Sequence, residues 1–403
     1  MRKLLLSVPL LAFACLSWLP VRAQSTLTFT SLPPMPSPHY GMGYCIYQSG
    51  LYSIGGGTTF GPLTADVFRF DLQQNRWDVG LGAPTPQRFT TAAVVEPNVI
   101  YVLNGATTTA NGVTPVVETV LMQGGSSGPS FANPSPTASA GSAVWNGLLY
   151  CYGGSVGTAF SNSLRSYNRA TNTWTNLAPM PEAKQTFGAA VNGKIYTFGG
   201  YNGVVNSSRI DVYDIATNQW TALGNLPTTV SNQAVAVQGE WIWLVGDFTN
   251  QSFLAAYNTR TAQLRTFSSN LPPRRNAAAA IAAAGNQLYV WGGNTASAGS
   301  ATLGDLWRAD VSFLVTGTRP AAAPALLQAY PNPSASGRFT VLRPAGATEL
   351  LVTDAVGREV LRQPLTGAAT EAQLDLTAQP AGLYLVRMST PGQPSAQCRV
   401  VRQ

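Results

Sequence analysis

The chain has 403 residues and a formal net charge of +7, and 45% of its residues are hydrophobic while only 10% are charged. At roughly 150 residues per domain, this length suits two or three domains with a sizeable core. One histidine and four cysteines leave little material for a histidine-rich metal site, a His-dependent catalytic triad or a disulfide scaffold.

The positive charge belongs mainly to the two ends of the chain. Residues 24–318 contain 13 basic and 12 acidic side chains, which is a nearly neutral balance. Nucleic-acid binding needs lysine and arginine concentrated on one face. We therefore expect no nucleic-acid partner.

The first 23 residues have the pattern of an export signal. Two basic residues precede the apolar residues 4–19, and Val21 and Ala23 supply small residues before the expected cleavage site. This pattern predicts a signal peptide at residues 1–23, with cleavage between Ala23 and Gln24. A membrane anchor is the alternative, but the apolar run is shorter than the about 20 residues that span a bilayer. We expect no integral membrane segment in the mature chain.

Three cysteines remain after removal of this signal, namely Cys45, Cys151 and Cys398. An odd number does not pair completely in an oxidising compartment. Each lies in an apolar, strand-like run, and free cysteine packs as a small hydrophobic residue. We predict buried free thiols.

A repeat fills the centre of the chain. Four copies of the pattern aromatic-x-x-Gly-Gly and two degenerate copies follow one another at spacings of 46 to 49 residues. Their aromatic residues are Tyr52, Tyr101, Tyr150, Tyr196, Trp243 and Tyr289. In three units an aromatic-Asp/Asn pair and a turn then precede a tryptophan: Trp77, Trp174 and Trp220. Each unit reads as four short strands, which is the size of one propeller blade.

These units resemble the kelch repeat, whose marks are the double glycine and the spaced tyrosine and tryptophan, over residues 26–312. The resemblance implies an all-β fold with a six-bladed kelch-type β-propeller at residues 24–316. The sixth unit lacks its outer strand, while residues 27–36 match the outer strand of the third unit. We therefore predict that the N-terminal strand completes blade six and removes an open sheet edge.

A Pro/Ala-rich linker is predicted at residues 317–327, followed by a small β-sandwich at residues 328–403. The last segment contains three ordered blocks: Tyr330-Pro331-Asn332-Pro333-Ser334, Asp354-x-x-Gly357-Arg358 and Pro380-Ala381-Gly382-Leu383-Tyr384. They resemble the type A C-terminal sorting domain of type IX secretion substrates. The resemblance implies recognition by that secretion machinery, passage across the outer membrane of a Gram-negative cell, removal of the tail, and release or attachment at the surface. A carbohydrate-binding sandwich is the alternative.

No catalytic motif accompanies the repeats. Copper radical oxidases of the kelch type need two histidine ligands, whereas His39 is alone, and there is no Walker loop, H-E-x-x-H or G-x-S-x-G motif. Six aspartates recur at two positions of the repeat and are expected to be scaffold: Asp66, Asp211 and Asp305, then Asp71, Asp214 and Asp310. We predict no catalytic residue, no metal site and no cofactor.

One repeat position does collect polar residues, six and seven residues before the centre of each innermost strand. The pairs are His39-Tyr40, Gln87-Arg88, Thr137-Ala138, Lys184-Gln185, Thr228-Thr229 and Arg274-Arg275. These loops are expected to ring one mouth of the central channel, where arginine and lysine would form a cationic funnel for carboxylate or sulfate groups. The candidate ligand-binding residues are His39, Tyr40, Arg88, Lys184, Gln185, Arg274 and Arg275. The alternative is that the cations at this position belong to the scaffold and bond neighbouring carbonyls.

Two functions fit these observations. The first is a secreted or cell-surface, non-catalytic and monomeric binding module for an extracellular glycan or protein. The second is an enzyme similar to the kelch-type sialic-acid mutarotases, which are exported propellers with an arginine-containing central pocket. The lack of a recognisable catalytic constellation favours the first.

Overall fold

The computed structural model describes residues 25–58, 63–81, 92–96, 99–103, 105–107, 112–121, 130–282, 284–295, 301–314, 327–354, 358–367, 369–390 and 396–403. These residues form β-strands and one short 3-10 helix, Ser312–Leu314, so the predicted all-β class is confirmed. The chain divides into two compact units, Met1–Leu314 and Val315–Gln403. Over the described ranges, no helix has the length and apolarity required to cross a membrane.

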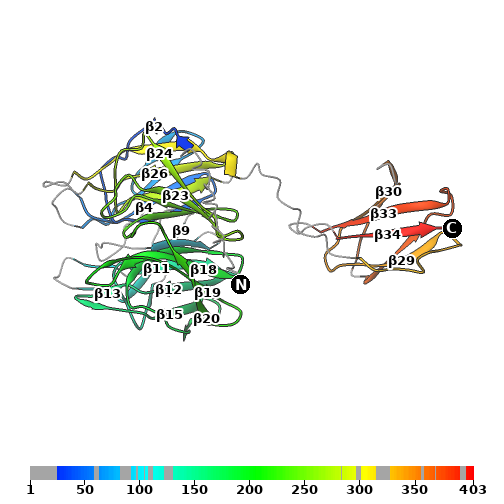
Figure 1. Ribbon diagram of the computed structural model, residues 1–403, viewed down its shortest axis with the longest axis horizontal. Coiled ribbons are helices and arrows are strands. Elements are labelled where there is room, and N and C mark those ends of the chain that lie inside the picture. The colour runs from blue at the N-terminus through cyan, green and yellow to red at the C-terminus, as the bar shows by residue number, and fades with distance from the viewer. Residues whose placement is uncertain are drawn as a thin grey trace, which may run out of the picture. The chain divides into compact units, whose positions relative to one another are not determined.

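The described strands of the first unit form a series of antiparallel sheets in chain order (Figure 1). The first contains β3 (Gly43–Tyr47), β4 (Gly50–Ile54), β5 (Val67–Asp71) and β6 (Arg76–Asp78), and the second β7 (Ala92–Glu96), β8 (Val99–Leu103), β9 (Val116–Leu121) and β10 (Phe131–Ala132). The third contains β11 (Gly141–Trp145), β12 (Leu148–Tyr152), β15 (Leu164–Asn168) and β16 (Thr173–Asn176), with a small hairpin of β13 (Ser155–Val156) and β14 (Ala159–Phe160) in its loop.

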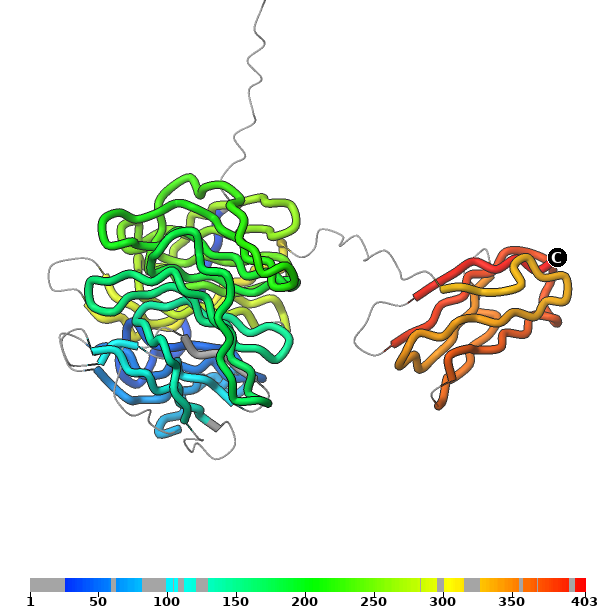
Figure 2. The backbone as a smooth tube through the Cα atoms, turned by 90° about the horizontal axis from the view of Figure 1, so that it is seen from below, coloured from blue at the N-terminus to red at the C-terminus, as the bar shows by residue number. Residues whose placement is uncertain are grey.

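Three further sheets follow. The fourth contains β17 (Gln185–Val191), β18 (Lys194–Tyr201), β19 (Asn206–Asp214) and β20 (Gln219–Asn225), and the fifth β21 (Ala234–Gln238), β22 (Trp241–Val245), β23 (Leu254–Asn258) and β24 (Leu264–Ser269). The sixth contains β25 (Ala278–Ala282), β26 (Gln287–Trp291) and β27 (Leu306–Asp310). The first strands of these sheets contact one another in the order β3, β7, β11, β17, β21 and β25, and β25 contacts β3 again. The sheets therefore close into a ring, as in a β-propeller. Figure 2 follows the chain of this unit from blue through green to yellow.

The N-terminal segment closes this ring. Strand β2 (Thr30–Leu32) pairs antiparallel with β27, which confirms the predicted closing strand. Unexpectedly, β1 (Ser25–Leu27) pairs in parallel with β24 of the fifth sheet. Between them, Phe29 is buried, and its backbone N–H and C=O bond the side-chain amide of Asn270 at 2.7 and 2.9 Å. One short segment thus holds two neighbouring sheets together.

The repeated residues serve the scaffold as predicted. Asp71 accepts hydrogen bonds from the backbone N–H groups of Gln73 and Gln74, and the equivalent Asp214 does the same in its own turn. Glycine is required at the second position of the pair. The backbone φ is +112° at Gly200 in the fourth sheet and +102° at the equivalent Gly56 in the first sheet. A Cβ at Gly200 would also lie 2.3 Å from the carbonyl oxygen of Gln185. The double glycine therefore leaves room for the backbone that leads into the innermost strand to pass close to the glycine pair.

The second unit consists of two sheets. One has the order β28 (Ala329–Tyr330), β29 (Arg338–Leu342) and β32 (Glu371–Asp375), and the other β31 (Glu359–Pro364), β30 (Glu349–Asp354), β33 (Gly382–Ser389) and β34 (Ala396–Arg402). Side chains of both sheets share a single core, including Phe339, Val341, Val352 and Val386.

The three cysteines in the described part of the chain form no disulfide with described residues, as predicted. Only Cys151 is buried, whereas Cys45 and Cys398 are half-buried. The prediction of burial is therefore wrong for two of the three, because β3 and β34 are only half-buried over most of their length.

The ring closure predicts a large effect of a small change near the N-terminus. Phe29→Ala should destabilise the first unit by about 3–5 kcal/mol, since it empties a fully packed aromatic site. Ser31→Ala, on the exposed side of β2, should change stability by less than about 0.5 kcal/mol. Urea unfolding of both variants measures the difference, and equal stabilities would show that the N-terminal segment does not hold the ring.

Candidate functional site

Six of the seven predicted ligand-binding residues lie in the described part of the chain, and they lie at one face of the first unit. His39, Tyr40, Arg274 and Arg275 immediately precede the first strands of their sheets, and Gln185 begins β17. The backbones of Tyr40, Gln185 and Arg275 pair with equivalent residues just beyond each glycine pair, namely Gly57, Tyr201 and Asn294. We call this the entry face: the loops that lead into the first strands and the loops that join second to third strands. Arg88 lies outside the described residues.

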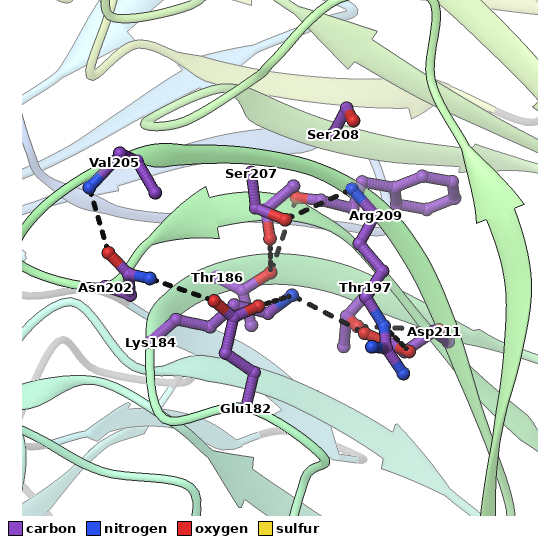
Figure 3. Close-up of polar contacts among 12 residues, drawn as sticks. Glu182, Lys184, Thr186, Thr197, Asn202, Val205, Ser207, Ser208, Arg209 and Asp211 are labelled. Carbon is purple, nitrogen blue, oxygen red and sulfur yellow. Dashed lines mark hydrogen bonds and ion pairs between the residues drawn. The ribbon is translucent and has the colours of Figure 1, made fainter.

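Lys184 belongs to a buried network within the fourth sheet (Figure 3). Its ammonium nitrogen lies 3.4 Å from a carboxylate oxygen of Asp211 and 3.4 Å from one of Glu182. Asp211 also accepts a 2.6 Å hydrogen bond from Nε of Arg209, and Glu182 accepts one from the amide of Asn202. Lys184 and Asp211 are each only 1% exposed. The charge of Lys184 is therefore neutralised inside the sheet.

Arg274 has the same role in the sixth sheet. Its guanidinium is fully buried and forms a bidentate pair with Asp305 at 3.1 and 2.9 Å. It also donates hydrogen bonds to the carbonyl oxygens of Pro272 and Gly292. Trp307 also donates its indole N–H to Asp305. These contacts use the donors of Arg274 within the scaffold, as the alternative sequence interpretation proposed.

His39 is buried against an aromatic ring. Its imidazole stacks on Phe68 with ring centroids 5.1 Å apart, and Nε2 lies 3.5 Å from Oδ2 of Asp66. Neither ring nitrogen has a hydrogen-bond partner among the described residues. Burial lowers the pKa of His39 below 6.5, and the nearby Asp66 carboxylate offsets part of that shift.

The second residue of each pair is less buried than the first. Tyr40, Gln185 and Arg275 are half-buried. Gln185 donates its amide to the hydroxyl of Ser155 at 2.9 Å. The Arg275 guanidinium carbon lies 4.1 Å from the ring centroid of Phe248, and its Nε has no hydrogen-bond partner among the described residues. Of Lys184, Arg274 and Arg275, Arg275 is thus the one that forms no ion pair within the described part of the chain.

An amide ladder surrounds the same mouth and was missed from the sequence. The backbone N–H of Gly41 donates to the carbonyl of Asn276, whose own N–H donates to the carbonyl of Asn232. Their side chains continue the pattern, since Asn232 donates to Asn276 and Asn276 to Asn294, at 2.7 and 2.9 Å. The predicted polar pair of the fifth sheet takes Val235 as the centre of the innermost strand. The register instead pairs Val237 with Ile242, so Val237 is the residue equivalent to the centres of the innermost strands in the first, third and sixth sheets. The predicted pair Thr228-Thr229 therefore lies two residues too early in the fifth sheet, where Val230 and Ser231 hold the equivalent positions. Asn232 and Asn276 were missed because they lie one residue after these pairs.

A central cavity of about 260 Å³ opens between the innermost strands. Residues of β3, β11, β17, β21 and β25 line it, most of them small. Tyr44 and Phe187 are the large exceptions. The Tyr44 hydroxyl accepts a 2.9 Å hydrogen bond from the backbone N–H of Val235 on β21. Burial raises the pKa of Tyr44 to about 12 and also raises that of the neighbouring Cys45 thiol. The two ionisable groups among the described lining residues are therefore neutral near pH 7.

The single histidine permits a direct measurement. The imidazole of His39 should titrate below pH 6.5 in the folded protein, and Asp66→Asn should lower its pKa further by removing the attracting carboxylate. Because the unfolded chain binds the proton more readily, the stability from neutral His39 is complete above about pH 6.5 and is lost as the pH falls toward the folded-state pKa. NMR of histidine-labelled protein measures both values, and a folded-state pKa at or above 6.5 would contradict the burial.

The buried pair predicts strong coupling. Lys184→Met and Asp211→Leu should each destabilise the first unit by about 3–5 kcal/mol, and the double variant should lose much less than the sum. The more accessible pair Lys194–Asp214, with side chains 42% and 29% exposed, provides the control, since Lys194→Met should cost at most about 1 kcal/mol. Chemical unfolding measures these values, and additive losses at Lys184 and Asp211 would argue against a buried pair.

Comparison with known proteins places this geometry in a family. Residues 45–247 match the family described as the KLHDC2/KLHL20/DRC7 Kelch-repeats domain, and residues 328–402 match the secretion system C-terminal sorting domain. No curated protein matches the sequence. A solved structure titled "Structure of YjhT" is similar with a TM-score of 0.59 at 15% identity, covering 68% of this chain and 95% of that chain, which shows a shared fold. The chain therefore belongs to the Kelch-repeat family, as a β-propeller protein that carries a secretion-system sorting domain.

Proposed function

We propose that the closed ring of the first unit is a six-bladed propeller at residues 24–316 and that the second unit is a β-sandwich at residues 328–403, joined by a linker at residues 317–327. The closed order of first strands supports the blade number, and the core shared by two sheets supports the sandwich. The proposed signal peptide, with cleavage between Ala23 and Gln24, lies outside the described residues.

We further propose that the protein is a non-catalytic binding module that acts outside the cell. The sorting-domain match indicates export by a type IX secretion system to the cell surface or the extracellular space. Whether the protein is released or attached at the surface depends on the fate of the tail. The propeller then presents its entry face to an extracellular protein or glycan.

The observation that carries this proposal is the apolar character of the entry face. Second-to-third-strand loops expose Val156, Val204, Val205 and Phe248, and Val79 follows the last strand of the first sheet at the same face. Val204 is 84% exposed. The other large apolar side chains exposed among the described residues of this unit are Leu223, Val237 and Phe313, which lie elsewhere. Apolar side chains gathered at one face mark a contact surface, and the aliphatic ones suit a protein ligand.

A kelch-type sugar-modifying enzyme, such as a sialic-acid mutarotase, is the second candidate. Arg275 favours it, because a half-buried guanidinium without an ion pair among the described residues suits a sugar carboxylate. The neutral groups that line the central cavity favour binding over acid–base chemistry.

Two assays on the purified protein separate these functions. A glycan array together with binding to surface proteins of the producing cells tests for a ligand, and NMR of N-acetylneuraminic acid tests for faster anomer exchange. We expect binding without accelerated exchange. Accelerated exchange that Arg275→Ala abolishes would establish the enzyme instead.

Variants of the entry face locate the contact. Val204→Ser with Phe248→Ser should weaken binding at least tenfold, and Arg275→Ala should weaken it by about 10- to 100-fold if the ligand carries a carboxylate. Leu223→Ser, on the outer strand β20, should leave the affinity unchanged. Titrations at matched folded fraction measure these affinities, and equal loss in Leu223→Ser and the entry-face variants would remove this face as the site.

A further inference from the structure

The two outward faces of the sorting domain differ in character. Apart from Leu342, the outward face of β29 and β32 in the three-stranded sheet is polar, and its polar residues pair across strands. Arg338 lies opposite Asp375 and forms an ion pair with it, and Thr340 lies opposite Gln373 and bonds its side chain. This is the usual pattern of an antiparallel sheet that faces water.

The outward face of the four-stranded sheet departs from that pattern. Alternation with the buried residues of β30, β33 and β34 places Leu351, Leu383, Leu385 and Val401 outward. Leu383 lies directly opposite Val401, and it is 43% exposed. The other three are half-buried. An apolar stripe therefore crosses a face that a solvated sheet would fill with polar side chains.

Two arginines stand within this stripe. Arg387 lies opposite Leu351 on β30, and Arg399 lies opposite Leu385 on β33, so the two arginines are diagonal neighbours on adjacent strands. Both are exposed, and neither has a carboxylate partner among the described residues. By contrast, Arg338, Arg358 and Arg362 are each paired with an acid. The two arginines give the stripe an uncompensated positive charge.

The three sequence blocks of the sorting domain are used to hold its fold. The Asn332 amide donates to the carbonyl of Arg399 and accepts from the N–H of Val401, which fixes the last strand. Tyr384 is buried and donates its hydroxyl to the carbonyl of Pro380, and Asp354 binds Arg358 across its turn. The block residues that hold the fold are therefore occupied within the domain, and recognition of the folded domain needs outward-facing side chains, such as that of Leu383 in the third block.

We propose that the outward face of the four-stranded sheet, marked by Leu383, Leu385, Arg387 and Arg399, is the surface on which a protein of the secretion machinery docks. This inference rests on the proposed export. The partner would present an apolar patch with carboxylates beside it, since guanidinium groups form bidentate bonds with carboxylates and arginine is common in protein interfaces. Complementary charge would fix the orientation of docking.

Export of the full chain by a Gram-negative host with a type IX secretion system tests this surface. Arg387→Gln with Arg399→Gln, and separately Leu383→Ser, should lower the amount in the medium and at the cell surface at least tenfold, with accumulation in the periplasm. The matched controls on the opposite face are Arg338→Gln and Leu342→Ser, because Leu342 is similarly exposed at 36%. Both controls should be exported like the unaltered chain.

Several results would overturn the inference. The first is normal export of the double arginine variant and of Leu383→Ser, and the second is an equal loss of export in the controls. The third is a lower melting temperature in the test variants but not in the controls, which would mean that the face packs within the protein. Binding of the purified protein to phosphatidylglycerol vesicles, lost in the double variant, would assign the face to a lipid surface instead. Export that persists after removal of residues 328–403 would contradict the proposal that this domain directs export. That result differs from normal export of the face variants, which would contradict only the docking surface.

Discussion

The structure of the first unit depends on closing a ring of sheets around one axis. Six first strands converge there, so their residues must be small or their backbones must pass closely, as at Gly200 and along the alanines of β25. Closure also needs an interaction between the two ends of the unit. The chain provides it with β2 on the sixth sheet, β1 on the fifth, and the Phe29–Asn270 bonds between them. Each sheet is therefore packed between two neighbours around the axis.

This packing decides which polar residues are available to a ligand. The chain that enters a first strand is held closely against the preceding sheet, as where the N–H of Gly154 donates to the carbonyl of Lys184, so the first residue of each polar pair lies in the interior. There a bare charge is costly, and Lys184 and Arg274 are accordingly paired with Asp211 and Asp305. The second residue lies nearer solvent, where Arg275 rests on Phe248. The candidate site is thus smaller and less cationic than a ring of six polar pairs would be.

Much of the fold could be predicted from the sequence because the repeat is a local pattern. Short-range constraints produce the double glycines, the turn aspartates and the unmatched outer strand at the N-terminus. The structure confirms that this outer strand closes the ring. The spacing could not show that β1 joins a different sheet, because parallel pairing leaves no periodic mark. The spacing also could not show that Lys184 is buried while Gln185 is half-buried. Which of two adjacent residues points inward depends on the register and on the irregular pairing between Gln185 and Phe187.

Side-chain surroundings account for the rest of what the sequence missed. Phe248 follows a degenerate repeat mark, and its role as a platform for Arg275 appears only when two loops of different sheets are brought together. In the sorting domain, the three blocks were visible as sequence, whereas the unpaired Arg387 and Arg399 stand out only beside arginines that have partners.

Amide hydrogen exchange tests the closed ring most directly. If the N-terminal segment completes the sixth sheet, the amides of β26 and β27 should exchange with the same opening free energy as those of β18 and β19, because the ring opens as one cooperative unit. Markedly faster exchange of β26 and β27 in the intact protein would contradict closure and show that the sixth sheet opens by itself.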